Sequence, residues 1–237
     1  MPDAAPAPPA GYVLPPQPVP TVAVAGTSAR FPVRRIICVG RNYAAHAREM
    51  GRDPDREPPF FFLKPADAVV DDGATVPYPP ETADLQHEIE LVVAIGRGGA
   101  NIPAEQALGH VFGYGVGIDL TRRDLQLRAR EQGRPWDWGK GFDLSAPIAP
   151  IRRAEEVGHP ASGRIWLAVD GRVRQDSDVA ELIWPVPDII AIASRSMELR
   201  PGDLIMTGTP EGVGRIERGQ AVTGGVDGLG EIGITVA

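Results

Sequence analysis

The sequence predicts an α+β protein with many short strands and few, short helices. Glycine and proline together interrupt the chain often, with 28 and 25 occurrences in 237 residues, and these residues end regular elements. Between them, apolar and β-branched segments of strand length alternate with short segments of helix-forming residues. The length is sufficient for one large domain or two small ones.

The elements follow in order. The first twenty residues are rich in alanine and proline and predict an extended arm. Strands are expected at 21–25, 34–39, 60–63, 85–95, 111–118, 165–169, 173–174 and 203–206, with two more at the end of the chain. Helices are expected at 44–50, 103–108, 121–131 and 186–197, and a loop at 136–143. Asp170-Gly171 is a strong hairpin signal.

Composition excludes several functional classes. The net charge is −7 and no basic tract occurs, so nucleic acid is not an expected partner. No apolar run approaches the ~18 residues of a membrane span, and the N-terminus lacks a signal-peptide pattern. Cys38 is the single cysteine, so no internal disulfide forms. These features fit a cytoplasmic protein.

Acidic residues at strand ends indicate a metal site. On a strand through 85–95, Glu88 and Glu90 share one face, and Asp119 ends another predicted strand. Paired carboxylates in an apolar setting need a cation, and three of them suit Mg²⁺, Mn²⁺ or Ca²⁺ better than zinc. The alternative is a solvated strand face. His87 lies on the opposite face, where packing or support of the site is favoured over ligation.

Two further motifs are candidates for catalysis. His46 and Glu49 share a helix face, so the carboxylate could orient the imidazole and raise its pKa; an ordinary surface pair is the alternative. The polar segment 52–59 after this helix is a candidate lid. Lys140 stands among Trp136, Trp138 and Phe142, which could hold it in a site, although most loop lysines are solvated.

Nucleotide binding is disfavoured. The segment 113–118 lacks the third glycine of the dinucleotide fingerprint, and 207–214 lacks the Gly-Lys-Ser/Thr of a phosphate loop. A non-catalytic β-domain that binds Ca²⁺ or a sugar stays open, although it would leave His46, Glu49 and Lys140 without a role.

Taken together, the motifs resemble those of the fumarylacetoacetate hydrolase family from about Arg34 to the C-terminus. They are Gly40-Arg41-Asn42-Tyr43 with His46 and Glu49, Lys64-Pro65, His87-Glu88-x-Glu90, Asp119 with Arg123 and Gln126, Trp138-Gly139-Lys140-Gly141-Phe142-Asp143, and Thr207-Gly208-Thr209-Pro210 with Gly212 and Gly214. The compact length and the segment 60–68 are most similar to fumarylpyruvate hydrolases of the gentisate pathway.

The resemblance implies a fold, an assembly and residue roles. The fold would be a mixed β-sheet roll or sandwich with short peripheral helices and a lid, forming one catalytic domain over 21–237 in a homodimer. Glu88, Glu90 and Asp119 would bind a divalent metal, most simply Mg²⁺. His46 and Glu49 would be the catalytic dyad and Lys140 the active-site lysine. The substrate-contact positions would be Arg41, Tyr43, Lys64, Arg123, Gln126 and Thr209.

The implied reaction is hydrolysis of the C–C bond of an acylpyruvate, a small 2-oxo acid. His46 would activate water and the cation would stabilise the pyruvate enolate that leaves. With fumarylpyruvate the products would be fumarate and pyruvate. An oxaloacetate decarboxylase, or an isomerase or hydratase of unsaturated 2-oxo acids, could use the same residues, so these alternatives remain.

Overall fold

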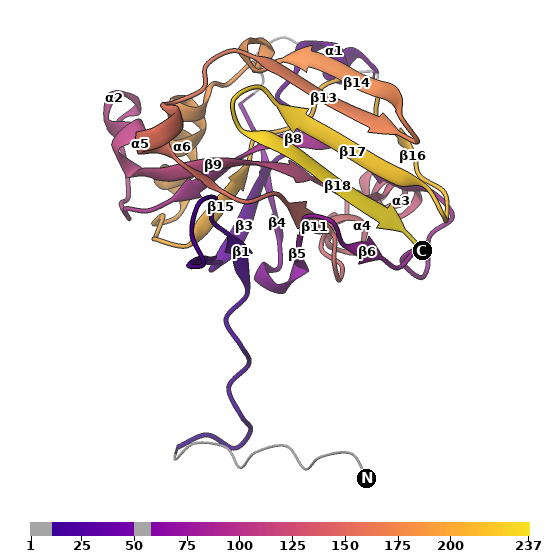
Figure 1. Ribbon diagram of the computed structural model, residues 1–237, viewed down its shortest axis with the longest axis horizontal. Helices are drawn as coiled ribbons and strands as arrows, with labels where there is room; N and C mark the ends of the chain where they lie inside the picture. The colour runs from indigo at the N-terminus through magenta and orange to yellow at the C-terminus, as the bar shows by residue number, and fades with distance from the viewer. Residues whose placement is uncertain (1–10, 50–57) are drawn as a thin grey trace.

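Two packed β-sheets dominate the computed structural model, which describes residues 11–49 and 58–237. A larger mixed sheet and a five-stranded sheet enclose an apolar core, and short helices lie around them (Figure 1). The predicted α+β class and mixed β roll are therefore confirmed.

The larger sheet has the strand order β4-β3-β15-β8-β9-β11-β5, with β12 paired to β9. Its strands are β3 (Arg35–Val39), β4 (Phe61–Lys64), β5 (Val69–Asp71), β8 (Ile89–Ile95), β9 (Val111–Ile118), β11 (Ala146–Ile148), β12 (Arg152–Arg153) and β15 (Asp203–Met206). The central strand β8 is buried along its whole length, as expected for a strand covered on both faces.

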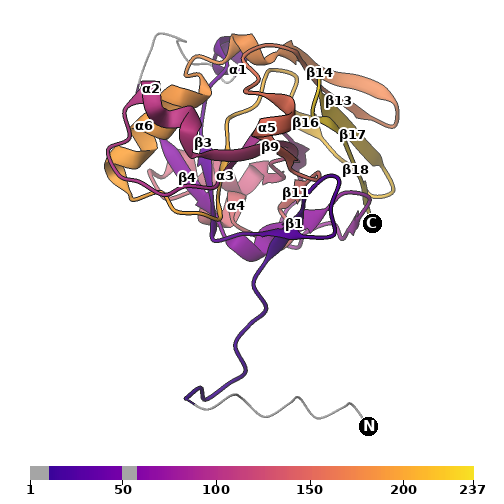
Figure 2. The ribbon, with the colours of Figure 1, turned by 60° about the vertical axis from the view of Figure 1, so that its left-hand side comes forward.

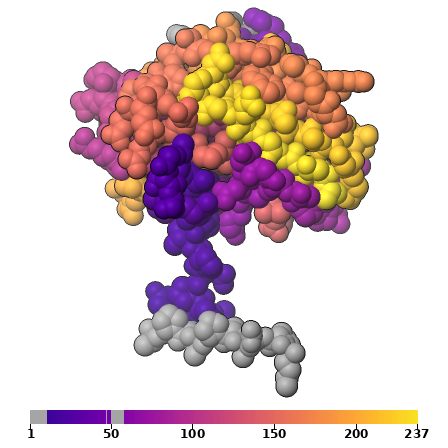
Figure 3. Space-filling model, viewed as in Figure 1, coloured from indigo at the N-terminus to yellow at the C-terminus, as the bar shows by residue number. Residues whose placement is uncertain are grey.

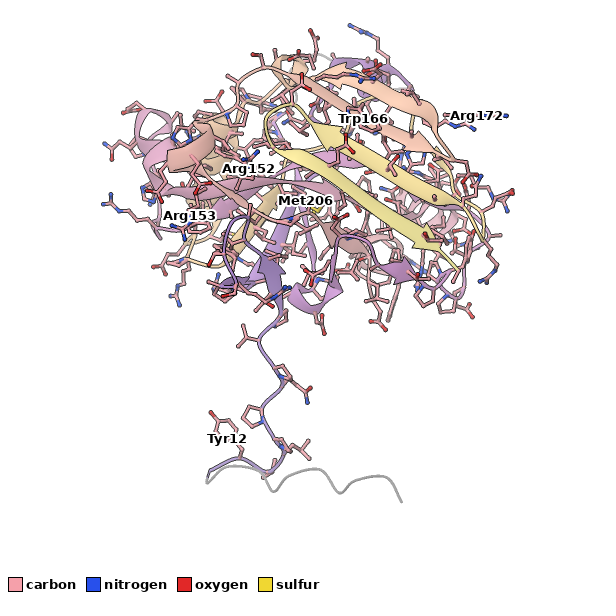
Figure 4. The ribbon with its side chains drawn as sticks, in the orientation of Figure 1. Tyr12, Arg152, Arg153, Trp166, Arg172 and Met206 are labelled. Carbon is pink, nitrogen blue, oxygen red and sulfur yellow. The ribbon has the colours of Figure 1, made fainter. Side chains whose placement is uncertain are left out.

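Side chains of β8 alternate between two apolar clusters. Leu91 and Val93 belong to the cluster shared with the five-stranded sheet, whereas Val92 and Ala94 belong to the cluster on the opposite face. Met206 of β15 lies in that second cluster, inside the molecule (Figure 4). The larger sheet is thus the middle layer, which explains its nearly continuous apolar sequence.

The five-stranded sheet has the order β14-β13-β17-β18-β6. Its strands are β6 (Thr75–Val76), β13 (Arg164–Val169), β14 (Arg172–Asp178), β17 (Ala221–Val226) and β18 (Gly230–Val236). Asp170 and Gly171 take φ values of 48° and 74° between β13 and β14, which confirms the predicted hairpin. Arg172 points outward from the edge strand β14 (Figure 4).

Two small sheets complete the strand inventory. One has the order β10-β7-β16, formed by β7 (Leu85–His87), β10 (Thr121–Arg122) and β16 (Gly214–Arg215); the other pairs β1 (Thr21–Ala23) with β2 (Arg30–Pro32). The single strand expected at 85–95 was wrong, because the chain changes sheets at Glu88. The apolar pattern continues through this point and gave no sign of the change of pairing partner.

The helices are short and peripheral (Figure 2). They are α1 (Ala44–Glu49), α2 (Ala104–Ala107), α3 (Arg123–Glu131), α4 (Asp137–Lys140), α5 (Ala154–Val157) and α6 (Val186–Ser196), with 3₁₀ turns η1 (Ala66–Ala68), η2 (Leu108–His110) and η3 (Val179–Glu181). The predicted loop 136–143 contains α4, which is a correction. Of the helices described, none has the length and hydropathy required to span a membrane.

The described part of the arm, residues 11–20, stands away from the body (Figures 1 and 3). Its residues are mostly exposed, and Tyr12 lies far from both sheets (Figure 4). Residues 1–10 of the arm and 50–57 of the predicted lid lie outside the described residues. The division into an arm and one catalytic domain over 21–237 stays a prediction.

The edge strand β4 also differs from expectation. The sequence predicted a buried strand at 60–63, but Leu63 is 47% exposed and only Lys64 of this strand is fully buried. Strand β4 has a neighbouring strand, β3, on one side only, so the sheet does not cover its other edge. The sequence does not reveal this exposure, because three phenylalanines and a leucine suit a buried central strand as well as an edge strand.

Candidate active site

Three carboxylates meet where strand β8 begins and strand β9 ends. The antiparallel register pairs Ile89 with Ile118, so the next residues, Glu88 and Asp119, are neighbours, and the Asp119 N–H donates to the Glu88 carbonyl at 2.8 Å. Glu90 follows two residues along β8. One carboxylate oxygen from each of Glu88, Glu90 and Asp119 lies within 4.8 Å of the others, and all three residues are buried.

Buried cations compensate two of these acids. Lys140 Nζ lies 2.8 Å from Glu88 Oε2 and 2.7 Å from Asp119 Oδ2. Lys64 Nζ lies 2.8 Å from Asp119 Oδ1, and Arg123 donates to Glu88 Oε1. These short contacts between fully buried groups hold Glu88 and Asp119 in fixed positions.

The cations determine the ionisation of Glu88. Burial alone would raise the pKa of Glu88, but Lys140 and Arg123 outweigh it and hold that pKa well below its usual range. Burial would likewise lower the pKa of Lys140, yet Asp119 and Glu88 raise it above its usual value. Both groups are therefore charged at neutral pH.

Glu90 is in the opposite situation. Burial, followed by the charges of Asp119 and Glu88, raises the pKa of Glu90 well above its usual value. Its Oε2 accepts a hydrogen bond from the Gly208 N–H at 2.6 Å, and no ion pair reaches it from the residues described here. The site thus contains one buried carboxyl that would lack a counterion if it were ionised.

This donor set fits a divalent cation. It consists of three carboxylates, which are the hard oxygen ligands of Mg²⁺, Mn²⁺ and Ca²⁺, and it contains no thiol or imidazole. A bound cation would supply the missing positive charge beside Glu90. A divalent metal therefore fits the cluster, whereas the choice of Mg²⁺ is not determined by these residues.

Local backbone geometry brings Gly208, whose N–H binds Glu90, beside that carboxyl. Strand β15 pairs with β8, so its exit brings Gly208 beside Glu90. Gly208 has φ +97°, and a Cβ there would lie 2.7 Å from the Asn42 Cβ. Only glycine takes this conformation without strain at such a close approach.

His46 and Glu49 form a hydrogen-bonded pair on α1. His46 Nδ1 lies 3.1 Å from Glu49 Oε2, and Glu49 also accepts from the Gly212 N–H at 3.2 Å. Because an ionised carboxylate only accepts, Nδ1 carries the proton, and in the neutral imidazole Nε2 keeps a lone pair. His46 is 5% exposed, so this is not the ordinary surface pair considered as an alternative.

The imidazole of His46 and one member of the acidic cluster, Glu88, line a cavity of about 90 Å³. The cavity is lined by Gly40, Arg41, His46, Glu88, Arg123, Gln126, Arg130, Trp136 and Lys140. A larger groove of about 550 Å³, lined by Phe60, Phe61, Phe62 and Leu63 among others, shares Arg41, Trp136 and Lys140 with it. The small cavity and the aromatic groove are therefore adjacent.

Close helix packing carries Lys140 into the site. A Cβ on Gly139 would lie 2.9 Å from the backbone of Gln126, so glycine permits α4 to approach α3 closely. Lys140, predicted in a loop, is the last residue of α4, and its Nζ also donates to Thr121 Oγ1 at 2.7 Å. The lysine is buried, not solvated.

The predicted substrate contacts fall into two groups. Arg41, Arg123 and Gln126 line the cavity, although Arg123 is also hydrogen-bonded to Gln126 and to the Gln86 side chain. The other three, Tyr43, Lys64 and Thr209, are buried and do not line it. Lys64 contacts Asp119, Thr209 accepts from Gln175 at 2.8 Å, and among the described residues the Tyr43 hydroxyl has no hydrogen-bond partner.

Sequence reasoning missed two residues of interest. Arg130 lines the cavity, and its spacing from Arg123 and Gln126 (i, i+3, i+7) places all three on one face of α3, a signal that was available. Gln175 is fully buried and hydrogen-bonds His87, which is not one of the groups of the acidic cluster. Nothing in the exposed, charged sequence around Gln175 indicated this.

Comparisons with known proteins identify the family of this chain. The family described as fumarylacetoacetate (FAA) hydrolase C-terminal matches residues 35–237. A fumarylpyruvate hydrolase of Ralstonia sp. is 46% identical over 79% of this chain and 98% of its own length. A mitochondrial oxaloacetate tautomerase of Arabidopsis thaliana is 41% identical over 84% of this chain and 88% of its own.

A solved structure provides a further comparison. The fumarylpyruvate hydrolase of Pseudomonas aeruginosa, in complex with Mn²⁺ and pyruvate, superposes with a TM-score of 0.94 at 56% identity, covering 95% of this chain and 99% of that one. The expectation of an enzyme that hydrolyses a carbon–carbon bond is confirmed by these relatives. The chain belongs to the fumarylacetoacetate hydrolase family.

Proposed function

We propose that this protein is a metal-dependent hydrolase that cleaves an acylpyruvate, with fumarylpyruvate as substrate and fumarate and pyruvate as products. The observation that carries this proposal is one cavity lined by a carboxylate-oriented histidine, a buried lysine and a member of the acidic cluster, namely His46, Lys140 and Glu88. The fumarylpyruvate hydrolase relatives support the choice of substrate. A role in gentisate breakdown would follow from that substrate.

Glu88, Glu90 and Asp119 would hold the cation, which we propose to be Mg²⁺. When bound, the cation supplies Lewis-acid stabilisation of negative charge on the oxygens of the 2-oxo acid. Lys64, Lys140 and Arg123 offset the charges of Glu88 and Asp119, and the cation would offset the charge of Glu90. The Mn²⁺ in the Pseudomonas aeruginosa relative supports a divalent ion.

His46 supplies the base. Its Nε2 takes a proton from water while Glu49 stabilises the positive imidazole through Nδ1. The resulting hydroxide adds to the distal ketone carbon, and the bond to the pyruvate carbon then breaks. The fumaryl fragment leaves with the added hydroxyl as a carboxylic acid, which ionises to fumarate and releases one proton to solvent. The pyruvate enolate takes up the proton held by His46, so atoms and charge balance. Lys140 provides positive charge beside the cluster throughout.

The remote carboxylate of fumarylpyruvate needs a cation on the groove side. Arg41 lines both the cavity and the aromatic groove, and Arg130 lines the cavity. We propose that these two guanidiniums bind the remote carboxylate. Arg123 is less suited, because its Nε, Nη1 and Nη2 already donate to Gln86, Gln126 and Glu88.

Turnover measurements test the proposal. Purified protein should cleave fumarylpyruvate faster than maleylpyruvate, acetylpyruvate or oxaloacetate, lose activity with a chelator and regain it with Mg²⁺ or Mn²⁺. The variant His46→Ala should bind metal but cleave fumarylpyruvate about 10²- to 10⁴-fold more slowly. Cleavage near the wild-type rate in that variant would remove the assigned base.

A second candidate is an oxaloacetate tautomerase, which the similarity to the Arabidopsis thaliana enzyme favours. That reaction needs a proton to move between carbon and oxygen, with no attacking water. Tautomerisation of oxaloacetate without cleavage of any acylpyruvate would select it. A non-catalytic metal-binding domain is disfavoured, since it would not explain the orientation of His46 by Glu49; a melting temperature that responds to Mg²⁺ but not to added oxalate would favour it.

We also propose a homodimer, as the family resemblance implies. Leu63, Leu127 and Trp138 are exposed large apolar side chains on the neighbouring elements β4, α3 and α4, and exposed apolar patches commonly mark interfaces. Light scattering coupled to size-exclusion chromatography would measure the mass, and a monomer at micromolar concentration would contradict this proposal.

A further inference from the structure

Gln175 of β14 joins three parts of the chain that meet at the site. Its Oε1 lies 3.1 Å from the Ile89 N–H and 3.0 Å from His87 Nδ1. Its Nε2 donates to Thr209 Oγ1 at 2.8 Å and to the Pro210 carbonyl at 2.9 Å. The side chain is fully buried, and all four of these contacts use its amide, so its hydrogen-bonding capacity is satisfied.

Two of these partners determine which end of the amide is which. The Ile89 N–H can only donate, so the atom facing it is the oxygen; the Pro210 carbonyl can only accept, so the atom facing it is the NH₂ group. His87 must then donate from Nδ1. Thr209 must accept at Oγ1, which leaves its own hydroxyl hydrogen available to donate.

Thr209 is one residue along the chain from a backbone donor to the acidic cluster. Thr209 follows Gly208, whose N–H binds Glu90 at 2.6 Å, and it is only 3% exposed. Within residues 11–49 and 58–237, no acceptor receives the Thr209 hydroxyl hydrogen. A buried hydroxyl with an unused hydrogen suits an anionic oxygen, and a 2-oxo acid carries such oxygens.

We propose that Gln175 is a positioning residue: it directs the hydroxyl of Thr209, the substrate-contact position expected from the family resemblance, to donate to the anionic oxygen of a bound 2-oxo acid. The inference rests on the proposed function for the class of ligand. Gln175 acts through Thr209 and does not itself contact the ligand. The same amide holds His87 and strand β8, so the loop and the strand that carries Glu90 are held in one register.

A double-mutant cycle tests this inference, with pyruvate affinity measured by calorimetry on the Mn²⁺-loaded full-length protein at about pH 8. Gln175→Glu retains the acceptors for Ile89 and His87, but its carboxylate turns the Thr209 hydrogen toward itself. Thr209→Val should weaken pyruvate binding about 10- to 100-fold in the wild-type background and less than about threefold in the Gln175→Glu background. Thr209→Ser should bind pyruvate like the wild type.

Several readouts separate positioning from mere stability. In protein saturated with Mn²⁺, Gln175→Glu should raise Kd for pyruvate and KM more than it changes kcat. As a control, Ser194→Ala removes another buried hydroxyl, on α6, which accepts from the Ile102 N–H and donates to the Ala191 carbonyl. This variant should lower Tm without changing Kd for pyruvate. Gln175→Met serves if Gln175→Glu does not fold, and Thr209→Val should then also have little further effect.

Additive losses in the cycle would overturn the inference. If pyruvate affinity changes as expected in this cycle but the wild-type protein does not cleave fumarylpyruvate, the proposed reaction is refuted and the role of Gln175 stands. A wild-type protein that binds no pyruvate would overturn both.

Discussion

Replacing Glu90 by Gln should stabilise the metal-free protein while abolishing its metal site. Glu90 is 1% exposed, and each of its acidic neighbours offers an oxygen within 4.8 Å. With an effective dielectric constant of about 20, each such contact between ionised groups costs about 3.5 kcal/mol before cations offset it. Protonation avoids that repulsion, which is why the pKa of Glu90 is raised.

The size of the effect is bounded by the cost of protonation. Keeping a carboxyl of ordinary pKa 4.5 protonated at about pH 7.5 costs at most ~4 kcal/mol, at 1.36 kcal/mol per unit. Glutamine removes this cost, so we expect a gain of about 1–3 kcal/mol in the free energy of unfolding, or about 2–4 °C of Tm per kcal/mol. Urea and thermal unfolding in the presence of a chelator measure it.

A matched control is Glu217→Gln, which removes a carboxylate from the exposed surface and should change stability by less than about 0.5 kcal/mol. Mn²⁺ should raise the Tm of the wild type and of the control but not that of Glu90→Gln. A Glu90→Gln protein that is less stable than the metal-free wild type, or that binds Mn²⁺ equally well, would refute the assignment of Glu90 as an uncompensated metal ligand.

Three other predictions follow from the same contacts. The pKa of Glu90 is raised in the folded state, so metal-free stability should fall as pH rises above about 4.5, and Mn²⁺ affinity should increase over the same range because the proton must leave; calorimetry in buffers of different ionisation enthalpy would count that proton. Lys140→Met leaves Glu88 and Asp119 without the cation that bridges them, so urea unfolding in the presence of a chelator should show a loss of about 3–5 kcal/mol in the free energy of unfolding. Mg²⁺ should restore part of this loss, and full stability of the variant without metal would contradict the prediction. Glu49→Gln should lower kcat about tenfold or more with Mn²⁺ affinity unchanged, since Glu49 orients His46 and lies outside the acidic cluster; an equal loss of metal binding would place Glu49 among the ligands.

The sequence by itself determined the type of fold and the chemical character of the site. Frequent glycine and proline limited every element to a short length, and alternation of apolar residues indicated the strands. Local periodicity is encoded in neighbouring residues, and it was enough to name the candidate side chains. Strand alternation and strand ends indicated Glu88, Glu90 and Asp119, and helical spacing indicated His46 and Glu49.

Only the tertiary structure decided how these parts meet. Glu88 and Asp119 become neighbours through the register of β8 with β9, and Lys140 reaches them because Gly139 lets α4 lie against α3. Gln175 bonds residues that are 86 and 88 positions away in the chain. At Glu88 the backbone leaves one sheet and enters another. Local propensity carries no information about such long-range pairings, since they depend on which surfaces bury each other when the whole chain packs.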